Sequence, residues 1–296
     1  MKIAKIIATS FSPGAVRDET TLNGNPPFFS LHSQNFKNIE EIKKLILFNI
    51  QKENESDPGL PVDLVFVNNN VGSVEGNEFV DKLNNKKLKN GKIIVIQNDN
   101  YGWSYGAFSR GFKELKDKYD YFIFTEVDVI VAKNNYAKIS LETFNHNINC
   151  GFVAYWGITF KLDEDTELVN DNQIHAHGAS GFSSKKVLEK VYNKYGKLPH
   201  SELTDKRDYD KIIKEGEVKF TNVIHKMGYL LTMCPQKLFN PAYDSMRGIN
   251  KPLRPNKFQE YKWFAKKYLM RKSYKFILYL KLDKIFKSIK KKIFNF

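Results

Sequence analysis

The sequence predicts an α/β fold in which a mostly parallel sheet is flanked by helices, with a basic amphipathic helical tail at the C-terminus. Three observations lead to this prediction. Apolar runs of strand length alternate with amphipathic segments of helix length over residues 1–131. Three of these runs end in polar residues, and open α/β sheets bind ligands beyond the carboxyl ends of their strands. Nearly all of the net charge of +14 lies in residues 251–296.

The first half of the chain alternates regularly between the two kinds of segment. Strands are expected at residues 2–9, 61–69, 92–98 and 119–131. Helices are expected at residues 36–54, 78–89 and about 103–118. The first helix is indicated by apolar residues at helical spacing, namely Ile39, Ile42, Leu45 and Ile46. Strands and helices that alternate in this order are typical of a parallel sheet.

The second half is less regular. A strand is expected at 151–160, a polar loop at 161–173 and a helix at 183–195. Glu217 opens one more helical pattern, which ends at Gly228. An acid in the first turn of a helix is commonly a partner of the helix dipole, so Glu217 needs further context before it is given a role.

Two acids, Glu126 and Asp128, stand near the end of the apolar run YDYFIFTEVDVIV. Residues two apart in a strand point to the same side. Burying two carboxylates there is costly unless a cation or a hydrogen-bond network receives them. The run therefore predicts a divalent-metal site whose ion carries phosphate oxygens. The alternative is a strand that ends at the surface with both acids in water.

Two other predicted strands also end in polar residues, at 68–70 and 98–100. Because ligands bind beyond the carboxyl ends of parallel strands, we expect these side chains and the acid pair to converge on one crevice. Such a crevice suits a nucleotide. The predicted donor-binding residues at these strand ends are Asn69, Asn70, Asn100 and Glu126.

Three glycines, Gly102, Gly106 and Gly111, punctuate the segment NYGWSYGAFSRGF. Glycines at a loop-to-helix turn let backbone amides approach phosphates, and we predict this role for Gly102 and Gly106. The alternative for Gly106 and Gly111 is close packing of the helix on the sheet. Arg110 is a further candidate for donor binding, and would face either a diphosphate or solvent.

The segment IHAHGASGF combines two histidines with two glycines. His175 and His177 share one side of an extended segment, which fits a polar acceptor pocket or a plain loop better than a metal site. We predict that His177, Gly178 and Ser180 bind the acceptor.

Composition excludes several classes of protein. Two cysteines, Cys150 and Cys234, are too few for a disulfide framework, and the Cys and His spacings do not suggest zinc. The N-terminal apolar run is short and interrupted by Lys5, so we interpret it as a strand and not as a signal peptide. The sequence shows no apolar run long enough to span a bilayer.

The tail, residues 251–296, carries fifteen Lys and Arg against only Glu260 and Asp283. A helical pattern at 256–293 combines these charges with apolar and aromatic residues, as in helices that lie on anionic lipid. We expect the tail to place a cytoplasmic protein on the inner face of the cell membrane, with no nucleic-acid partner. The alternatives are a charged helix packed on the domain and an RNA-binding tail.

Three segments together resemble the GT-A class of nucleotide-sugar glycosyltransferases, which has a Rossmann-like fold, and especially the large inverting family that builds bacterial surface polysaccharides. The family's Asn/Gly-rich turn before its metal strand is matched by Asn100, Gly102, Gly106 and Gly111. Its Asp-x-Asp motif is matched by Glu126-Val127-Asp128. Its Glu-Asp pair and following helix are matched by Gly216-Glu217 and the segment to Gly228. The resemblance covers roughly residues 1–232.

The resemblance implies a metal-dependent transferase that moves a sugar from a nucleotide sugar to a capsular, lipopolysaccharide or lipid-linked glycan. Mn²⁺ or Mg²⁺ would be held by Asp128 and Glu126, and Glu217 would be the general base. Rival bases are Asp205, Asp208 and Asp210. The predicted catalytic domain spans residues 1–250, with a nucleotide-binding half to 131 and an acceptor half from 132, and the tail follows.

The sequence departs from the family at three motifs. The first metal acid is Glu126 and not Asp, asparagines at 68–70 replace the usual Asp pair, and Gly216 replaces the first acid of the Glu-Asp pair. The donor base and the stereochemistry therefore stay open. A sugar-phosphate nucleotidyltransferase is the alternative enzyme, with residues 12–17 as a poor match to its Gly-rich, Arg-containing loop. A non-catalytic membrane-associated protein that binds sugar nucleotides is the other alternative.

Overall fold

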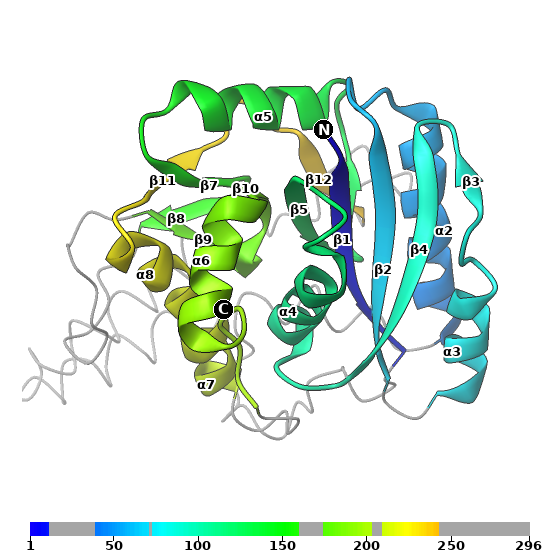
Figure 1. The fold of residues 1–296 in the computed structure, drawn as a ribbon. Helices are drawn as coiled ribbons and strands as arrows, with labels where there is room; N and C mark the ends of the chain where they lie inside the picture. The colour runs from blue at the N-terminus through cyan, green and yellow to red at the C-terminus, as the bar shows by residue number, and fades with distance from the viewer. Residues whose placement is uncertain (12–38, 71–72, 160–173, 203–208, 243–296) are drawn as a thin grey trace, which may run out of the picture. The chain divides into compact units, whose positions relative to one another are not determined.

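The computed structural model describes residues 1–11, 39–70, 73–159, 174–202 and 209–242 (Figure 1). The chain divides into two compact units, residues 1–242 and 243–296, and every described residue belongs to the first. The predicted tail and two rival bases, Asp205 and Asp208, lie outside the described residues, as does the side chain of Asp210. Within the described part, no helix is both long and apolar enough to cross a membrane.

An eight-stranded sheet forms the centre of the described unit, in the order β11-β7-β10-β5-β1-β2-β4-β3. Its strands are β1 (Ile3–Ser10), β2 (Val62–Asn70), β3 (Lys87–Leu88), β4 (Gly91–Asp99), β5 (Tyr121–Glu126), β7 (Cys150–Ala154), β10 (Gly181–Ser184) and β11 (Leu230–Met233). β1, β2, β4 and β5 run parallel, and β10 runs antiparallel to β5 and β7. The predicted α/β fold with a mostly parallel sheet is confirmed.

Helices cover both faces of the sheet (Figure 1). They are α2 (Ile39–Glu55), α3 (Val74–Asp81), α4 (Trp103–Leu115), α5 (Tyr136–His146), α6 (Lys185–Tyr195), α7 (Tyr209–Ile213) and α8 (Lys219–Lys226). Successive residues of a strand point to opposite faces. Ile6 of β1 therefore packs in one core cluster with α4, α6 and α8, while Ile7 packs in another with α2 and α3. Helix α5 lies on the α2 face, where it packs with Ile3 and Ile123.

The apolar run at 119–131 forms two strands, so the prediction of one continuous strand is wrong. β5 ends at Glu126, and a turn follows at 127–128. β6 (Val129–Val131) then leaves the main sheet and pairs antiparallel with β12 (Phe239–Pro241). Because a turn separates the two acids, the strand alternation that we expected of Glu126 and Asp128 does not apply to them.

Some predicted boundaries also differ from the structure. The helix expected at 78–89 begins earlier, because the Ser73 side chain caps α3 by accepting the Gly76 N–H. Residues 87–88 form β3 instead. The strand expected at 151–160 bends at 155–156 and continues as β8 (Gly157–Thr159), which pairs with β9 (Ile174–Ala176). Helix α5 was not predicted. Only three of its residues, Tyr136, Ala137 and Ser140, are buried, so its sequence shows a weak helical pattern of apolar residues.

Candidate active site

Helix α4 begins at a sharp turn at the carboxyl ends of the parallel strands. Gly102 has a φ of 62° and Trp103 a φ of 53°, both in the left-handed region. For a bulky residue such as Trp103 this conformation costs of order 1–3 kcal/mol, so the surrounding structure has to hold it. One holding contact comes from β2, where Asn69 Nδ2 donates to the Trp103 carbonyl at 3.0 Å. The end of β2 is thereby tied to the start of α4.

Ser104 ties the same turn to Glu126, a predicted metal ligand. Its Oγ donates to Glu126 Oε1 at 2.5 Å. Glu126 is half-buried and is the last residue of β5, where it lies beside Ala8 of β1. The first N–H groups of a helix carry partial positive charge, which favours a carboxylate at this position. The strand end and the helix start together hold the Glu126 side chain.

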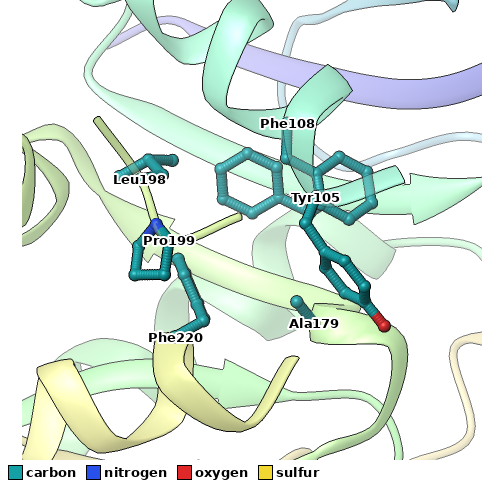
Figure 2. A pocket seen from close by; sticks show the side chains of 7 residues that line it. Tyr105, Phe108, Ala179, Leu198, Pro199 and Phe220 are labelled. Carbon is teal, nitrogen blue, oxygen red and sulfur yellow. The ribbon is translucent and has the colours of Figure 1, made fainter. Parts of the chain in front are cut away.

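Tyr105 ties the turn to Glu217, the predicted base. Its hydroxyl donates to Glu217 Oε2 at 2.8 Å, and the backbone N–H of Gly178 donates to the same oxygen at 2.7 Å. Glu217 is only 4% exposed. A buried carboxylate is costly without such donors. Figure 2 shows the Tyr105 hydroxyl directed away from Phe108 and Phe220.

Glu217 stands in a π-helical turn, η4 (Lys214–Val218), directly before α8. π-Helical turns are rare in proteins, and those that do occur are often found at functional sites. Gly216 lets the turn approach α4, because a Cβ on Gly216 would lie 2.2 Å from Tyr105 Cδ2. The α-helix expected from Glu217 begins at Lys219, after this turn, and the Tyr105 ring leaves no room for a side chain at position 216.

The two predicted donor-binding asparagines of β2 have different surroundings. Asn69 donates to the first residue of α4, as described above. Its Oδ1 also accepts from Asn98 Nδ2 at 2.7 Å, across the β2–β4 pair. Asn70 is exposed and accepts from Asn77 Nδ2 of α3 at 3.0 Å. The structure therefore brings Asn69 to the first turn of α4, and it brings Asn70 to α3.

The glycines of the α4 turn have close neighbours within the chain. A Cβ on Gly102 would lie 2.6 Å from the Ser201 carbonyl oxygen, and one on Gly106 would lie 1.6 Å from the Tyr101 carbonyl oxygen. Packing alone thus requires glycine at both positions. Asn100 is half-buried in the loop that leads into this turn. Donor binding by these three residues stays a prediction.

Arg110 is not brought to the first turn of α4. It lies on the exposed face of the helix, where a guanidinium nitrogen is 3.1 Å from Glu114 Oε1. Of the two surroundings considered for Arg110, the structure shows the solvent-exposed one.

Asp128 occupies the turn after β5. It is half-buried, and its carbonyl accepts from the Ala242 N–H at 2.7 Å. No group of three or more His, Cys, Asp or Glu side chains comes together as a metal site within the described residues. Glu126 and Asp128 still fit Mg²⁺ or Mn²⁺, since these ions take carboxylate oxygens and complete their shell with water and substrate phosphates.

The predicted acceptor segment forms a short 3₁₀ turn, η2 (His177–Ala179), before β10. Gly178 has a φ of 62° and reaches Glu217 through its N–H. Ser180 is buried. It lies close to Gly178, since a Cβ on Gly178 would be 3.5 Å from Ser180 Oγ. The side chain of His177 lies outside the described part. Gly178 is thus the predicted acceptor residue that the structure brings to Glu217.

A small apolar pocket lies against the side chain of Tyr105 (Figure 2). It is lined by Tyr105, Phe108, Phe124, Ala179, Leu198, Pro199 and Phe220. Its volume of about 10 Å³ is roughly that needed for one water. The adjoining loop packs His200 against Gly102, and burial lowers the pKa of His200 despite a hydrogen bond to the Ser201 carbonyl. The apolar lining limits water on this side of Tyr105.

Three residues that the sequence prediction missed make the contacts that assemble this site. They are Trp103, Ser104 and Tyr105, consecutive in the first turn of α4. A sequence signal was available, because they stand between Gly102 and Gly106 at the start of a helix. Side chains at that position of a helix lie close to any ligand bound at its N-terminus.

No protein-family model and no curated protein matches the chain. Among solved structures, S. aureus TarS 1-349 in complex with UDP is 12% identical over 81% of this chain and 60% of that one, with a TM-score of 0.43. The mannosyltransferase PcManGT from Pyrobaculum calidifontis, in complex with GDP-Man and Mn²⁺, is 11% identical over 80% and 55%, with a TM-score of 0.41. The 4-diphosphocytidyl-2C-methyl-D-erythritol synthase from Anaerococcus prevotii is 13% identical over 78% and 87%, with a TM-score of 0.38.

These similar structures thus include a glycosyltransferase and an enzyme of a different class. The chain spans less than two thirds of the length of the TarS and mannosyltransferase chains. At these identities and TM-scores, the likeness assigns no activity, substrate or metal to this chain.

Proposed function

We propose that the chain is a metal-dependent glycosyltransferase that moves a sugar from a nucleotide-sugar donor to a polysaccharide or lipid-linked glycan acceptor. One observation carries the proposal. Adjacent residues in the first turn of α4, Ser104 and Tyr105, hold two carboxylates that come from distant parts of the chain, Glu126 and Glu217. A transfer to a sugar hydroxyl needs two such groups, one near the leaving diphosphate and one near the acceptor.

The proposed reaction is an inverting transfer. The acceptor oxygen forms a bond to the anomeric carbon of the donor, and the bond from that carbon to the diphosphate oxygen breaks with its electron pair. Glu217 takes the proton of the acceptor hydroxyl. Tyr105 and the Gly178 N–H both donate to Glu217 Oε2, so they would orient the carboxylate for this step.

Glu126 and Asp128 are the proposed ligands of Mn²⁺ or Mg²⁺. When bound, the ion would neutralise the charge that grows on the leaving diphosphate. Ser104 would keep Glu126 in position at the end of β5, and the N-terminus of α4 would favour the same anionic group. Asn69 would support the donor side of the site by holding the α4 turn.

The first experiment is a thermal-shift screen of nucleotide diphosphates and nucleotide sugars, each with Mn²⁺ and with EDTA. A ligand that binds the folded state raises the melting temperature by mass action. We expect a shift for one nucleotide that is lost in EDTA, which would identify the base of the donor. No shift with any of these ligands would contradict the proposal.

The second experiment uses paired variants in a transfer assay with the donor so identified. Asp128→Ala and Glu217→Gln are each expected to abolish transfer while the protein stays folded. The matched controls are Asp117→Ala, which removes an exposed acid, and Glu215→Gln, two residues before Glu217. Normal transfer by Asp128→Ala would rule out the proposed metal ligand, and normal transfer by Glu217→Gln would rule out the base.

The same assay separates the alternatives. A sugar-phosphate nucleotidyltransferase would form a nucleotide sugar from a nucleoside triphosphate and would run in reverse with pyrophosphate. A non-catalytic binding protein would shift in the thermal screen but turn over neither substrate. Glycosyl transfer is expected only of the proposed function.

A further inference from the structure

Helix α2 buries two polar side chains within its apolar stripe. The stripe begins with Ile42, Leu45 and Ile46 and continues, at the same helical spacing, with Asn49 and Glu53. Asn49 is 1% exposed and Glu53 is 4% exposed. Burying a polar group costs free energy unless it is hydrogen-bonded, so each of these two residues has to be explained.

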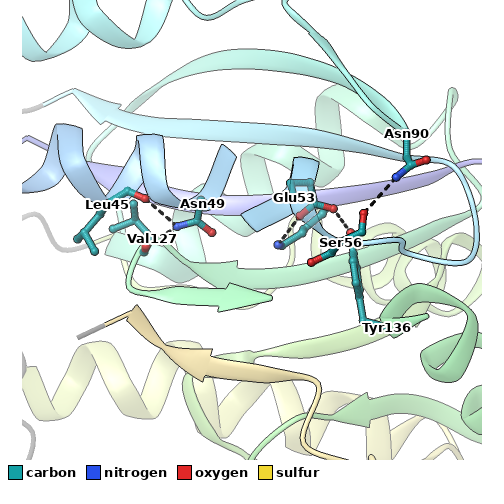
Figure 3. Close-up of polar contacts among 8 residues, drawn as sticks. Leu45, Asn49, Glu53, Ser56, Asn90, Val127 and Tyr136 are labelled. Carbon is teal, nitrogen blue, oxygen red and sulfur yellow. Dashed lines mark hydrogen bonds and ion pairs between the residues drawn. The ribbon is translucent and has the colours of Figure 1, made fainter. Parts of the chain in front are cut away.

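Contacts within the core account for Glu53. Its Oε2 accepts from Lys5 Nζ of β1 at 2.9 Å, and the Tyr136 hydroxyl of α5 donates to its other oxygen (Figure 3). The Lys5 ammonium also lies over the rings of Tyr136 and Phe239, at 5.5 and 5.2 Å from the ring centroids. The acid therefore has a paired charge and joins α2 to β1 and α5.

The contacts of Asn49 are different. Its Nδ2 donates to the Val127 carbonyl at 2.7 Å and to the Leu45 carbonyl at 3.1 Å (Figure 3). Both partners are acceptors, which determines which end of the amide is the NH₂ group. The other end, Oδ1, is buried without a hydrogen-bond partner in the described part of the chain. An apolar side chain would avoid that cost but would leave the Val127 carbonyl without this donor, so the bond to Val127 is what asparagine supplies here.

Val127 is the residue between the two proposed metal ligands. Three successive peptide groups in this turn make hydrogen bonds to distant parts of the chain. The Val127 N–H donates to the Ala8 carbonyl at 3.1 Å, Asn49 donates to the Val127 carbonyl, and the Ala242 N–H donates to the Asp128 carbonyl at 2.7 Å. Of these three bonds, only the one from Asn49 is made by a side chain, so one substitution can remove it.

We propose that Asn49 is a positioning residue for the metal site. By holding the Val127 peptide group it sets the directions in which Glu126 and Asp128 leave the turn, and hence how their carboxylates meet a divalent cation. This inference rests on the proposed function. Groups that orient metal ligands in this way typically change metal affinity by about 10- to 100-fold when they are removed.

The test is a titration of the full chain with Mn²⁺ alone. Electron paramagnetic resonance measures the concentration of free Mn²⁺ at each step. Asn49→Leu removes the donor to Val127, so we expect at least a tenfold higher Kd for Mn²⁺. The loss of melting temperature should be small, because removal of the unpaired oxygen offsets part of the cost of leaving the Val127 carbonyl without its donor. Asn49→Thr is the second variant, in case the first does not fold. Its hydroxyl can still bond the Leu45 carbonyl one turn back but is too short to hold Val127.

The matched control is Tyr136→Phe. It removes a hydrogen bond to Glu53, the next buried polar residue of α2, and leaves the bond to Val127 in place. It should lower the melting temperature and keep the Kd for Mn²⁺ within about twofold of wild type. If wild type binds Mn²⁺ and both Asn49 variants bind it equally well, the positioning role is wrong and the proposed metal site stands. If wild type itself does not bind Mn²⁺, the metal site and the positioning role fail together.

Discussion

The Tyr105 hydroxyl and the Glu217 carboxylate are 112 residues apart in the sequence and 2.8 Å apart in the structure. Ser104, the neighbour of Tyr105, makes the corresponding contact with Glu126. A single turn of α4 therefore sets the distance between the two acids of the proposed site. Removal of either hydroxyl should affect catalysis more than it affects the stability of the fold.

We predict that Tyr105→Phe lowers kcat and leaves the KM for the donor close to wild type. The substitution removes a donor to Glu217 Oε2 and keeps the ring that packs on Gly216. A hydrogen bond to a charged group contributes roughly 1.5–3 kcal/mol, which corresponds to about a 10- to 100-fold loss of rate. Steady-state kinetics of the purified variant measures both constants.

The matched control for this prediction is Tyr119→Phe. Tyr119 is also buried and also donates to an acid, with its hydroxyl 2.6 Å from Asp63 Oδ2, but that contact lies away from the site. It should cost stability and not kcat. Equal kcat losses in the two variants would mean that the Tyr105 contact is only structural.

We predict that Gly216→Ala destabilises the protein and lowers activity together. The added Cβ would lie 2.2 Å from Tyr105 Cδ2, so either the ring or the π-helical turn has to move. Overpacking of this kind costs about 1–3 kcal/mol. Urea unfolding of Gly216→Ala, Tyr105→Ala and the double variant forms a cycle, in which the contact predicts a coupling of at least about 0.5 kcal/mol. Additive effects would show that the two residues do not touch in solution.

We predict that Lys5→Met costs more stability than the double variant Lys5→Met/Glu53→Leu. The single change leaves the buried Glu53 without its cation, and breaking a buried ion pair typically costs about 3–5 kcal/mol. The double change leaves no buried charge behind and is expected to recover most of this loss. Denaturant midpoints of the two variants test the order, and a less stable double variant would contradict it.

We predict that removal of the chain from Asn256 onward releases the protein from vesicles that contain anionic lipid and spares donor hydrolysis. Basic residues near such a surface contribute about 1 kcal/mol each, and the charge of the chain is concentrated in this tail. Vesicle sedimentation measures the binding, with neutral vesicles and high salt as controls. Unchanged binding after the deletion would contradict the prediction that the tail binds the membrane.

Local patterns in the sequence were sufficient to predict β1, β2 and β4 and the polar ends of β2 and β4, but not the end of β5 at Glu126. Strand and helix periodicities depend on neighbouring residues, so they can be recognised without a structure. β2 and β4 appear within a residue or two of their predicted bounds for this reason. The crowding of charge in residues 251–296 is likewise a property of composition.

Only the tertiary structure decided how the candidate site is assembled. The turn after Glu126 depends on bonds from three separate parts of the chain, and the Tyr105–Glu217 contact depends on how α4 packs against η4. The roles of Gly216 and Asn49 could not be predicted from the sequence, because the residues that they contact are far away along the chain. Local periodicity determines which segments form strands and helices, whereas packing between distant segments determines which side chains meet.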